Sequence, residues 1–161
     1  MKKFIYVVIV NYKSWEDTIE CIESIINSKF RNFQIILVDN NSDNDSVERI
    51  KQYFDGHNPP VIGNRDFKAE TKPRTQPIPY IYFDYLKGRS LPSLPEVKES
   101  KYGGGLENSV IFIKNSENLG FAGGNNVALK MLVDAKLDKQ SKILLLNPDT
   151  YIEKNALEHL S

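Results

Sequence analysis

The chain has 161 residues, a length typical of one domain, and 40% of them are hydrophobic while 26% are charged. This composition excludes a disordered chain, which would be too polar to build a core. The 21 basic and 21 acidic side chains cancel, so no net field draws the protein to nucleic acid or to an anionic membrane. We therefore expect partners to be recognised at local sites, with no nucleic acid among them.

The N-terminal segment is apolar but short. Residues 4–10 form an apolar run that Asn11 and Tyr12 end, with no small-residue cleavage site after it. No apolar stretch approaches the roughly 20 residues that a membrane-spanning helix needs. The single Cys21 cannot form an internal disulfide, which fits a reducing compartment. The sequence predicts a cytoplasmic protein, with peripheral contact at the inner face of the cell membrane as the remaining form of membrane association.

The first third of the chain alternates buried strands with amphipathic helices. The run over 4–10 is continuously apolar and β-branched, which is typical of a central parallel strand covered on both faces. Apolar residues recur at helical spacing over 14–26 and predict a helix that Ser14 caps. Residues 34–38 predict a second buried strand, and the pattern over 47–54 predicts a short second helix.

The segment over residues 56–107 differs in character, because it is rich in proline and glycine and lacks sustained periodicity. We interpret it as an insertion in which residues 80–85 add a short strand. Regular structure resumes after it. Residues 109–113 predict a third buried strand, 125–135 a helix, and 142–146 a fourth strand.

Strands that alternate with helices imply parallel βαβ units, whose ligands bind outside the carboxyl ends of the strands. We therefore predict an α/β fold with a mostly parallel sheet and flanking helices, in a single domain over 1–161. Polar clusters follow the four predicted strands, at 11–12, 39–42, 115–118 and 147–149. Any one of them also suits a strand end or a helix cap. The functional interpretation therefore depends on all four lying together at the carboxyl ends of the strands, as one polar rim.

Two carboxylates on this rim suit a nucleotide and a metal. Asp39 follows an apolar strand, where its carboxylate is placed to accept hydrogen bonds from a base or a ribose. Asp149 can give oxygen to Mg²⁺ or Mn²⁺, whose other positions are filled by diphosphate oxygens and water. One carboxylate binds a divalent metal only weakly, so we expect metal and nucleotide to bind together.

A glycine-rich segment, Gly120 to Gly124, precedes the predicted helix over 125–135. Because glycine has no Cβ and helix N-termini favour anions, backbone N–H groups here can approach a phosphate or a ribose closely. The segment matches neither the dinucleotide-binding fingerprint nor a Walker A loop. A plain flexible turn between strand and helix is the alternative.

Four ordered motifs resemble those of family 2 glycosyltransferases, most closely a bacterial rhamnosyltransferase-like branch. They are VVIVNY at 7–12, LVDNNS at 37–42, NSENLGFAGGNN at 115–126 and LLNPDT at 145–150. The resemblance implies a GT-A fold, which is Rossmann-like, and covers nearly the whole chain except 56–107. It also implies an enzyme that transfers a sugar, with inversion, from a UDP- or dTDP-sugar to a glycan or lipid-linked acceptor in bacterial cell-surface polysaccharide synthesis.

The resemblance further implies roles for single residues. Asn11, Tyr12 and Asp39 contact the nucleobase, while Asn118 and the glycines after it lie near the ribose and diphosphate. The implied set of donor-binding residues is Asn11, Tyr12, Asp39, Asn41, Asn118, Gly120, Gly123, Gly124, Asn126 and Asn147.

Residues 147–149 take the place of the family's D-x-D motif. Asp149 inherits the metal, whereas Asn147 replaces an acidic residue and becomes a ribose or water-mediated contact. The family's acceptor-binding half and its catalytic base lie beyond the position of Ser161. No base is therefore named in this chain, which reads as a GT-A domain truncated at its C-terminus, and we expect it to bind the donor without efficient transfer.

Two alternatives from other classes stay open. One is a non-catalytic nucleotide-binding or interaction module that kept the fold. The other is a phospho-receiver domain with Asp39 as the phosphate acceptor, in which residues 120–124 and 145–150 would have no role. Separately, an uncovered apolar side of the strand at 142–146 would favour self-association into a homo-oligomer.

Overall fold

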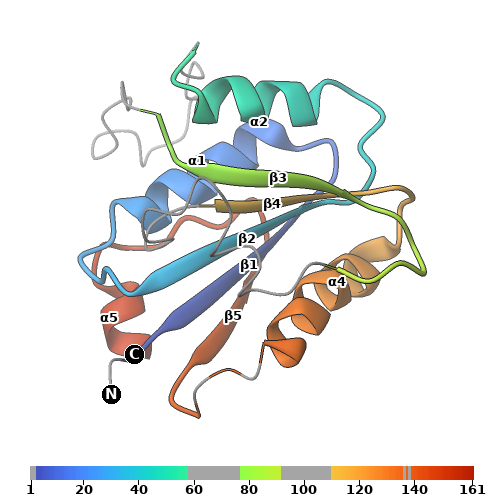
Figure 1. Ribbon diagram of the computed structural model, residues 1–161. Helices are drawn as coiled ribbons and strands as arrows, with labels where there is room; N and C mark the ends of the chain where they lie inside the picture. Colours follow the sequence, from blue (N-terminus) through green and yellow to red (C-terminus); the bar gives the residue numbers. More distant parts are fainter. Residues whose placement is uncertain (1–2, 58–76, 92–109, 136, 138) are drawn as a thin grey trace.

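The computed structural model describes residues 3–57, 77–91, 110–135, 137 and 139–161 (Figure 1). Its elements in chain order are β1 (Ile5–Asn11), α1 (Trp15–Ile26), β2 (Phe33–Asp39), α2 (Ser46–Phe54), β3 (Tyr80–Tyr85), β4 (Val110–Asn115), α4 (Gly120–Asp134), β5 (Lys142–Leu146) and α5 (Ala156–Leu160).

The five strands form one sheet in the order β3-β4-β2-β1-β5, and every neighbouring pair is parallel (Figure 1). The earliest strands therefore lie inside the sheet, which explains why their sequences are apolar throughout rather than alternating. All carboxyl ends meet at one edge of the sheet. The predicted α/β fold with a parallel sheet is confirmed.

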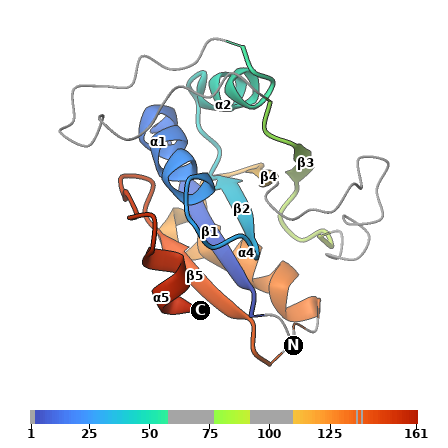
Figure 2. The same ribbon diagram turned by 90° about the vertical axis from the view of Figure 1, so that its left-hand side faces the viewer.

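Helices cover both faces of the sheet (Figures 1 and 2). One core lies between the sheet and α1, α2 and α5, and the other lies between the sheet and α4. Side chains alternate along β1, so its odd-numbered residues enter the first core and its even-numbered residues enter the second. The chain leaves β1 toward one face and β4 toward the other. Crevices between such diverging connections are where open α/β sheets bind ligands.

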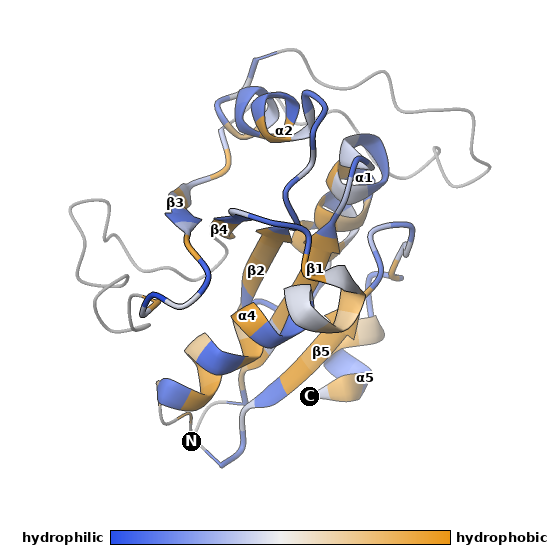
Figure 3. Cartoon of the chain, turned by 90° about the vertical axis from the view of Figure 1, so that its right-hand side faces the viewer, coloured by the Kyte–Doolittle hydropathy of each residue, from blue (hydrophilic) through white to orange (hydrophobic). Residues whose placement is uncertain are grey.

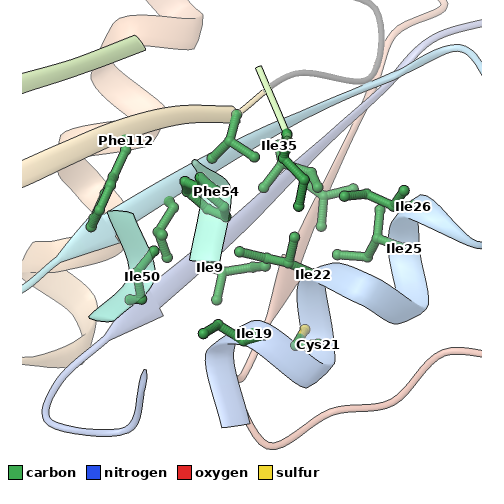
Figure 4. Packing of buried hydrophobic residues seen from close by; sticks show 14 of the residues in the cluster. Ile9, Ile19, Cys21, Ile22, Ile25, Ile26, Ile35, Ile50, Phe54 and Phe112 are labelled. Atoms are coloured by element: carbon green, nitrogen blue, oxygen red, sulfur yellow. The ribbon is translucent and has the colours of Figure 1, made fainter. Parts of the chain in front are cut away.

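Hydrophobic residues concentrate in the strands of the sheet (Figure 3). On the α1 face, Ile9, Ile22 and Phe54 point toward one another from β1, α1 and α2 (Figure 4), and each is fully buried. Burying one such side chain contributes about 1.5–3 kcal/mol. This larger core holds the three elements that end at, or begin from, the carboxyl edge.

The predicted strands are confirmed within two residues at each end, but the helix predicted over 125–135 begins at Gly120 instead. The glycines therefore belong to the first turns of α4 and not to a loop. Glycine is needed at position 124 because the helix packs closely there, where a Cβ would lie 2.8 Å from Val10 Cγ1. Ser14 does precede α1, but its hydroxyl donates to the Tyr12 carbonyl at 3.3 Å and does not cap the helix.

The strand predicted at 80–85 is confirmed as β3, which forms the edge of the sheet beside β4. The backbone N–H of Ile78 donates to the Phe54 carbonyl at 2.8 Å, and the Ile78 side chain is buried. This part of the predicted insertion is thus integral to the fold. The remainder, 58–76 and 92–107, lies outside the described residues.

Among the described residues, the opposite edge strand, β5, is covered on one face and exposed on the other. Leu144 and Leu146 pack against the core that includes α5, while Ile143 and Leu145 are 40% and 45% exposed. These two side chains give a physical reason for the predicted self-association, which stays a prediction.

Across the described residues, no helix combines the length and the apolar character needed to cross a membrane.

Candidate functional site

The polar clusters after β1, β2 and β4 meet at the carboxyl edge of the sheet. Asn11 lies directly opposite Asp39 in the parallel register of β1 and β2. Because side chains alternate along a strand, Asp39 faces α1 whereas Asn40 faces α4. Two separate hydrogen-bond networks follow, one on each face of the sheet.

The first network surrounds the carboxylate of Asp39, which is fully buried. Oδ2 accepts hydrogen bonds from Asn11 Nδ2 and from the Ser42 hydroxyl, both at 2.7 Å, and Oδ1 accepts from the Ser42 backbone N–H at 2.9 Å. The Thr18 hydroxyl donates to Asn11 Oδ1 at 2.9 Å and so ties α1 to the same group. Three donors compensate the buried charge and fix the ends of β1 and β2 together.

The loops that follow β1 and β2 carry backbone strain. Lys13 and Asn41 have φ angles of 60° and 61°, a region that residues other than glycine rarely occupy. The Lys13 N–H donates to the Ser42 hydroxyl at 2.9 Å, which locks the two loops to each other. Such strain persists only where surrounding contacts hold it, and it clusters at functional sites.

Tyr12 lies next to this strained pair and is 42% exposed, so its ring is available to a ligand. Lys13 Nζ lies 5.1 Å from the centre of that ring and pairs with Asp43 at 2.6 Å. The hydrogen bond to Asp43 raises the pKa of Lys13, and the same bond lowers the pKa of Asp43. Both groups are exposed, so the pair fixes a cation beside the ring without contributing much to stability.

The second network is centred on the side-chain amide of Asn40. Its Nδ2 donates to Asn118 Oδ1 at 2.8 Å and to the Gly120 carbonyl at 3.0 Å. Its Oδ1 accepts from Asn115 Nδ2 and from the Leu119 N–H, both at 3.0 Å. One side chain thus joins β2 to the end of β4 and to the start of α4.

The glycines of α4 allow this close approach. Gly120 has a φ angle of +69°, and its N–H donates to Asn118 Oδ1 at 2.9 Å. A Cβ on Gly123 would lie 2.6 Å from Leu119 Cβ, and one on Gly124 would lie 3.5 Å from Asn40 Cγ. The α4 N-terminus therefore lies against β1 and β2 with its first N–H groups at the carboxyl edge, an arrangement that suits an anion.

The fourth cluster, after β5, is a turn that packs against α1. The Asn147 carbonyl accepts from the Thr150 N–H at 3.1 Å and from the Cys21 thiol at 3.8 Å. Burial, with the nearby charge of Asp149 as a smaller cause, raises the pKa of Cys21 to about 12. The side chains of Asn147 and Asp149 are both exposed and free to meet a ligand.

A divalent metal fits this turn only together with a ligand. Within the described residues there is no group of three or more His, Cys, Asp or Glu side chains arranged to hold a metal ion. Asp149 offers one exposed carboxylate, and Mg²⁺ is commonly held by one or two carboxylates with phosphate oxygens and water completing its shell. The donor set thus suits a metal that arrives with a diphosphate.

The structure brings together Asn11, Asp39, Asn118, Gly120 and Gly124 through the two networks. Asn126 is different, because it lies on the exposed face of α4 and no described contact joins it to the rim.

For Asp39, full burial and three hydrogen bonds are unfavourable for a phosphate acceptor, which argues against a receiver domain.

Sequence reasoning placed Asn40, Ser42 and Asn115 in the polar clusters at the strand ends but assigned none of them a role, although they organise the rim. The alternation of side chains could have found Asn40, because a residue after Asp39 must face the opposite layer. Asn115 is 1% exposed, and its Oδ1 has no hydrogen-bond partner in the described part of the chain. A buried acceptor of this kind is uncommon and marks the rim as chemically distinctive.

The parallel sheet, its two helical layers and the polar carboxyl edge define an α/β domain of the GT-A type. The crystal structure of S. aureus TarS 1-349 has the same fold, with a TM-score of 0.54 and 15% sequence identity. The superposition covers 98% of this chain and 31% of that chain, so the protein described here spans about a third of its length.

The sequence model of the family described as Glycosyl transferase family 2 matches residues 6–66, which include β1, α1, β2 and α2. This match confirms the resemblance to family 2 glycosyltransferases over the segment that holds the Asn11–Asp39 network. No curated protein matches the chain.

Proposed function

We propose that this chain binds the sugar donor of an inverting glycosyltransferase. The donor is a UDP- or dTDP-sugar held with Mg²⁺ or Mn²⁺, and the acceptor is a glycan or a lipid-linked glycan of bacterial cell-surface polysaccharide synthesis. One observation carries the proposal: at the carboxyl edge of the sheet, Asp39 and Asn40 each organise a network of polar side chains. Both residues belong to the segment that matches the family.

The nucleoside would lie over the ends of β1 and β2. Tyr12 offers an exposed aromatic ring, and stacking of a base on such a ring contributes about 1–3 kcal/mol. Asp39 has two oxygens with roughly four acceptor positions, three of which the fold already uses. Because Asp39 is fully buried, it would shape the nucleoside side by holding the loops after β1 and β2, and Asn41 in the adjoining loop would supply a polar contact.

The diphosphate would lie between the start of α4 and the turn after β5. Asn118, Gly120 and the following glycines place backbone N–H groups at the helix N-terminus, where negative charge is favoured. Asp149 would hold the metal, which when bound offsets the charge of the leaving diphosphate. Asn147 would contact the ribose directly or through water.

Transfer with inversion also needs a general base that deprotonates the acceptor hydroxyl. We assign that role to no residue of this chain, so the proposal for these 161 residues is donor binding without efficient transfer. We also propose a cytoplasmic location, with peripheral contact at the inner face of the membrane where a lipid-linked acceptor would lie.

The substitution Asp149→Asn tests the proposal. With Mn²⁺ present, calorimetric titration should show UDP binding about tenfold more weakly than to the unchanged chain, because a ligand of the metal is lost. In EDTA the two proteins should bind UDP equally. Asp134→Asn, at the exposed end of α4, is the matched control and should bind like the unchanged chain in both buffers. An Asp149→Asn variant that keeps full Mn²⁺-dependent affinity would refute the assigned role.

A further inference from the structure

We infer that Asn40 is a positioning residue that sets the N-terminus of α4 for the diphosphate while leaving the nucleoside side of the site unaffected. The inference depends on the proposed function for its ligand and on the hydrogen bonds of Asn40 for its geometry. Asn40 is 2% exposed, so it acts on a ligand only through the groups that it holds.

The Asn40 side-chain amide uses both its nitrogen and its oxygen to hold residues 118–120. Nδ2 donates to Asn118 Oδ1 and to the Gly120 carbonyl, at 2.8 and 3.0 Å, and Oδ1 accepts from the Leu119 N–H at 3.0 Å. Three consecutive residues are therefore fixed by one side chain. A single residue with donor and acceptor in a planar amide is needed for this, and aspartate or serine cannot replace it fully.

The conformations of Gly120 and Asn118 depend on the hydrogen bonds from Asn40. Gly120 has a φ angle of +69°, so the turn into α4 adopts a conformation that its own backbone does not enforce. Two hydrogen bonds orient the side chain of Asn118, because its Oδ1 accepts from Asn40 Nδ2 and from the Gly120 N–H. Without Asn40, Asn118 keeps one of these two bonds and the Leu119 N–H loses its acceptor.

Within the described residues, no hydrogen bond joins the side chains of one network to those of the other, and the link between them is the backbone bond from the Asn40 N–H to the Asn11 carbonyl at 2.8 Å, which a change of the Asn40 side chain keeps. The group around Asp39 involves Asn11, Ser42 and Thr18 on the α1 face, whereas the group around Asn40 lies on the α4 face. Asp39, the last residue of β2, and Asn40, which follows it, thus support different halves of one site. A change at Asn40 should therefore alter recognition of the diphosphate and spare that of the nucleoside.

The test compares UDP with uridine on Asn40→Ala. We expect the Kd for UDP to rise about tenfold and the Kd for uridine to change less than twofold, because the three hydrogen bonds by which Asn40 holds residues 118–120 are lost. Asn27→Ala is the matched control, since Asn27 ends α1 at the far edge of the sheet and donates to Glu23 Oε2 at 3.3 Å. It should leave both affinities unchanged. Equal losses for UDP and uridine on Asn40→Ala would overturn the inference.

A second measurement needs no ligand. Hydrogen exchange of the Leu119 amide should become at least tenfold faster in Asn40→Ala, while exchange of the Leu37 amide in β2 follows global stability only. Unchanged protection of Leu119 would overturn the positioning role. If the unchanged chain binds no nucleotide, the proposed function fails, and the exchange result still decides whether Asn40 holds the turn.

Asn40→Asp covers the case in which Asn40→Ala does not fold. Aspartate keeps an acceptor for the Leu119 N–H but loses the donor to Asn118 and Gly120. Leu119 should then stay protected while UDP affinity still falls selectively. An Asn40→Asp variant with full UDP affinity would show that the Nδ2 bonds do not position the site.

Discussion

The side-chain amide of Asn11 donates a 2.7 Å hydrogen bond to Asp39 Oδ2, and both residues are fully buried. They are direct partners in the register of β1 and β2, so this bond joins the last residues of two central strands. It adds to a backbone bond at the same point, where the Asn40 N–H donates to the Asn11 carbonyl at 2.8 Å. It holds the two following loops close enough for Lys13 and Ser42 to meet.

Replacing Asp39 should therefore destabilise the fold as well as the site. In Asp39→Ala the Asn11 amide and two Ser42 donors lose their acceptor inside the protein, and we expect a loss of about 3 kcal/mol in the free energy of unfolding. Urea denaturation measures it. Asp43→Ala removes an exposed carboxylate in the same loop and should change stability far less than Asp39→Ala does, because its ion pair with Lys13 is screened by solvent. Similar effects of the two variants would contradict the buried network.

Gly124 should tolerate no methyl group while Val10 is present. Alanine normally favours a helix over glycine by about 1 kcal/mol, but here its Cβ would lie 2.8 Å from Val10 Cγ1. We expect Gly124→Ala to destabilise the protein by about 1–3 kcal/mol. In a Val10→Ala background the same change should become neutral or stabilising. A double-mutant cycle by thermal unfolding measures this coupling, and strict additivity would show that α4 lies farther from β1.

Stability should fall at alkaline pH through Cys21. The pKa of its thiol is raised from 9.0 to about 12 by burial and by Asp149, so between these values the unfolded chain loses a proton that the folded chain keeps. Unfolding is then favoured, by up to about 1.4 kcal/mol per pH unit. Cys21→Ala should show a shallower decline from pH 9 to 12. Identical slopes would mean that the thiol is not buried as described.

Tyr12 should recognise the nucleoside. Tyr12→Ala is expected to raise the Kd for uridine about tenfold, because stacking on the exposed ring is lost. Tyr12→Phe keeps the ring and should stay within about threefold of the unchanged chain. If both variants bind uridine normally, the base does not lie on this ring and the assignment of the nucleoside half is wrong.

The fold was largely predictable because its central strands are covered on both faces. Continuous apolar runs such as residues 4–10 and 34–38 leave few other interpretations. The start of α4 was not predictable from local preference. The glycines at 120, 123 and 124 disfavour a helix, and the approach of Gly124 to Val10 explains why glycine is present at that position in spite of this cost.

The site was predictable in its positions and less so in its organisation. Strand ends identified Asp39, and its burial could not be seen from the sequence, because burial depends on the register of β1 against β2. Asn40 was placed in the cluster at 39–42, but its role was not predicted, because its partners at 115 and 118–120 lie on elements distant in the chain. Contacts of that separation follow from the order of the sheet and not from any local pattern.

The most direct test of donor binding is calorimetric titration of the unchanged chain with UDP and with dTDP, first with Mn²⁺ and then with EDTA. We predict binding of at least one nucleotide, weakened when EDTA removes the metal, because Asp149 alone offers the metal too few ligands without a diphosphate. Absence of binding to either nucleotide under both conditions would contradict donor binding and favour a non-catalytic interaction module.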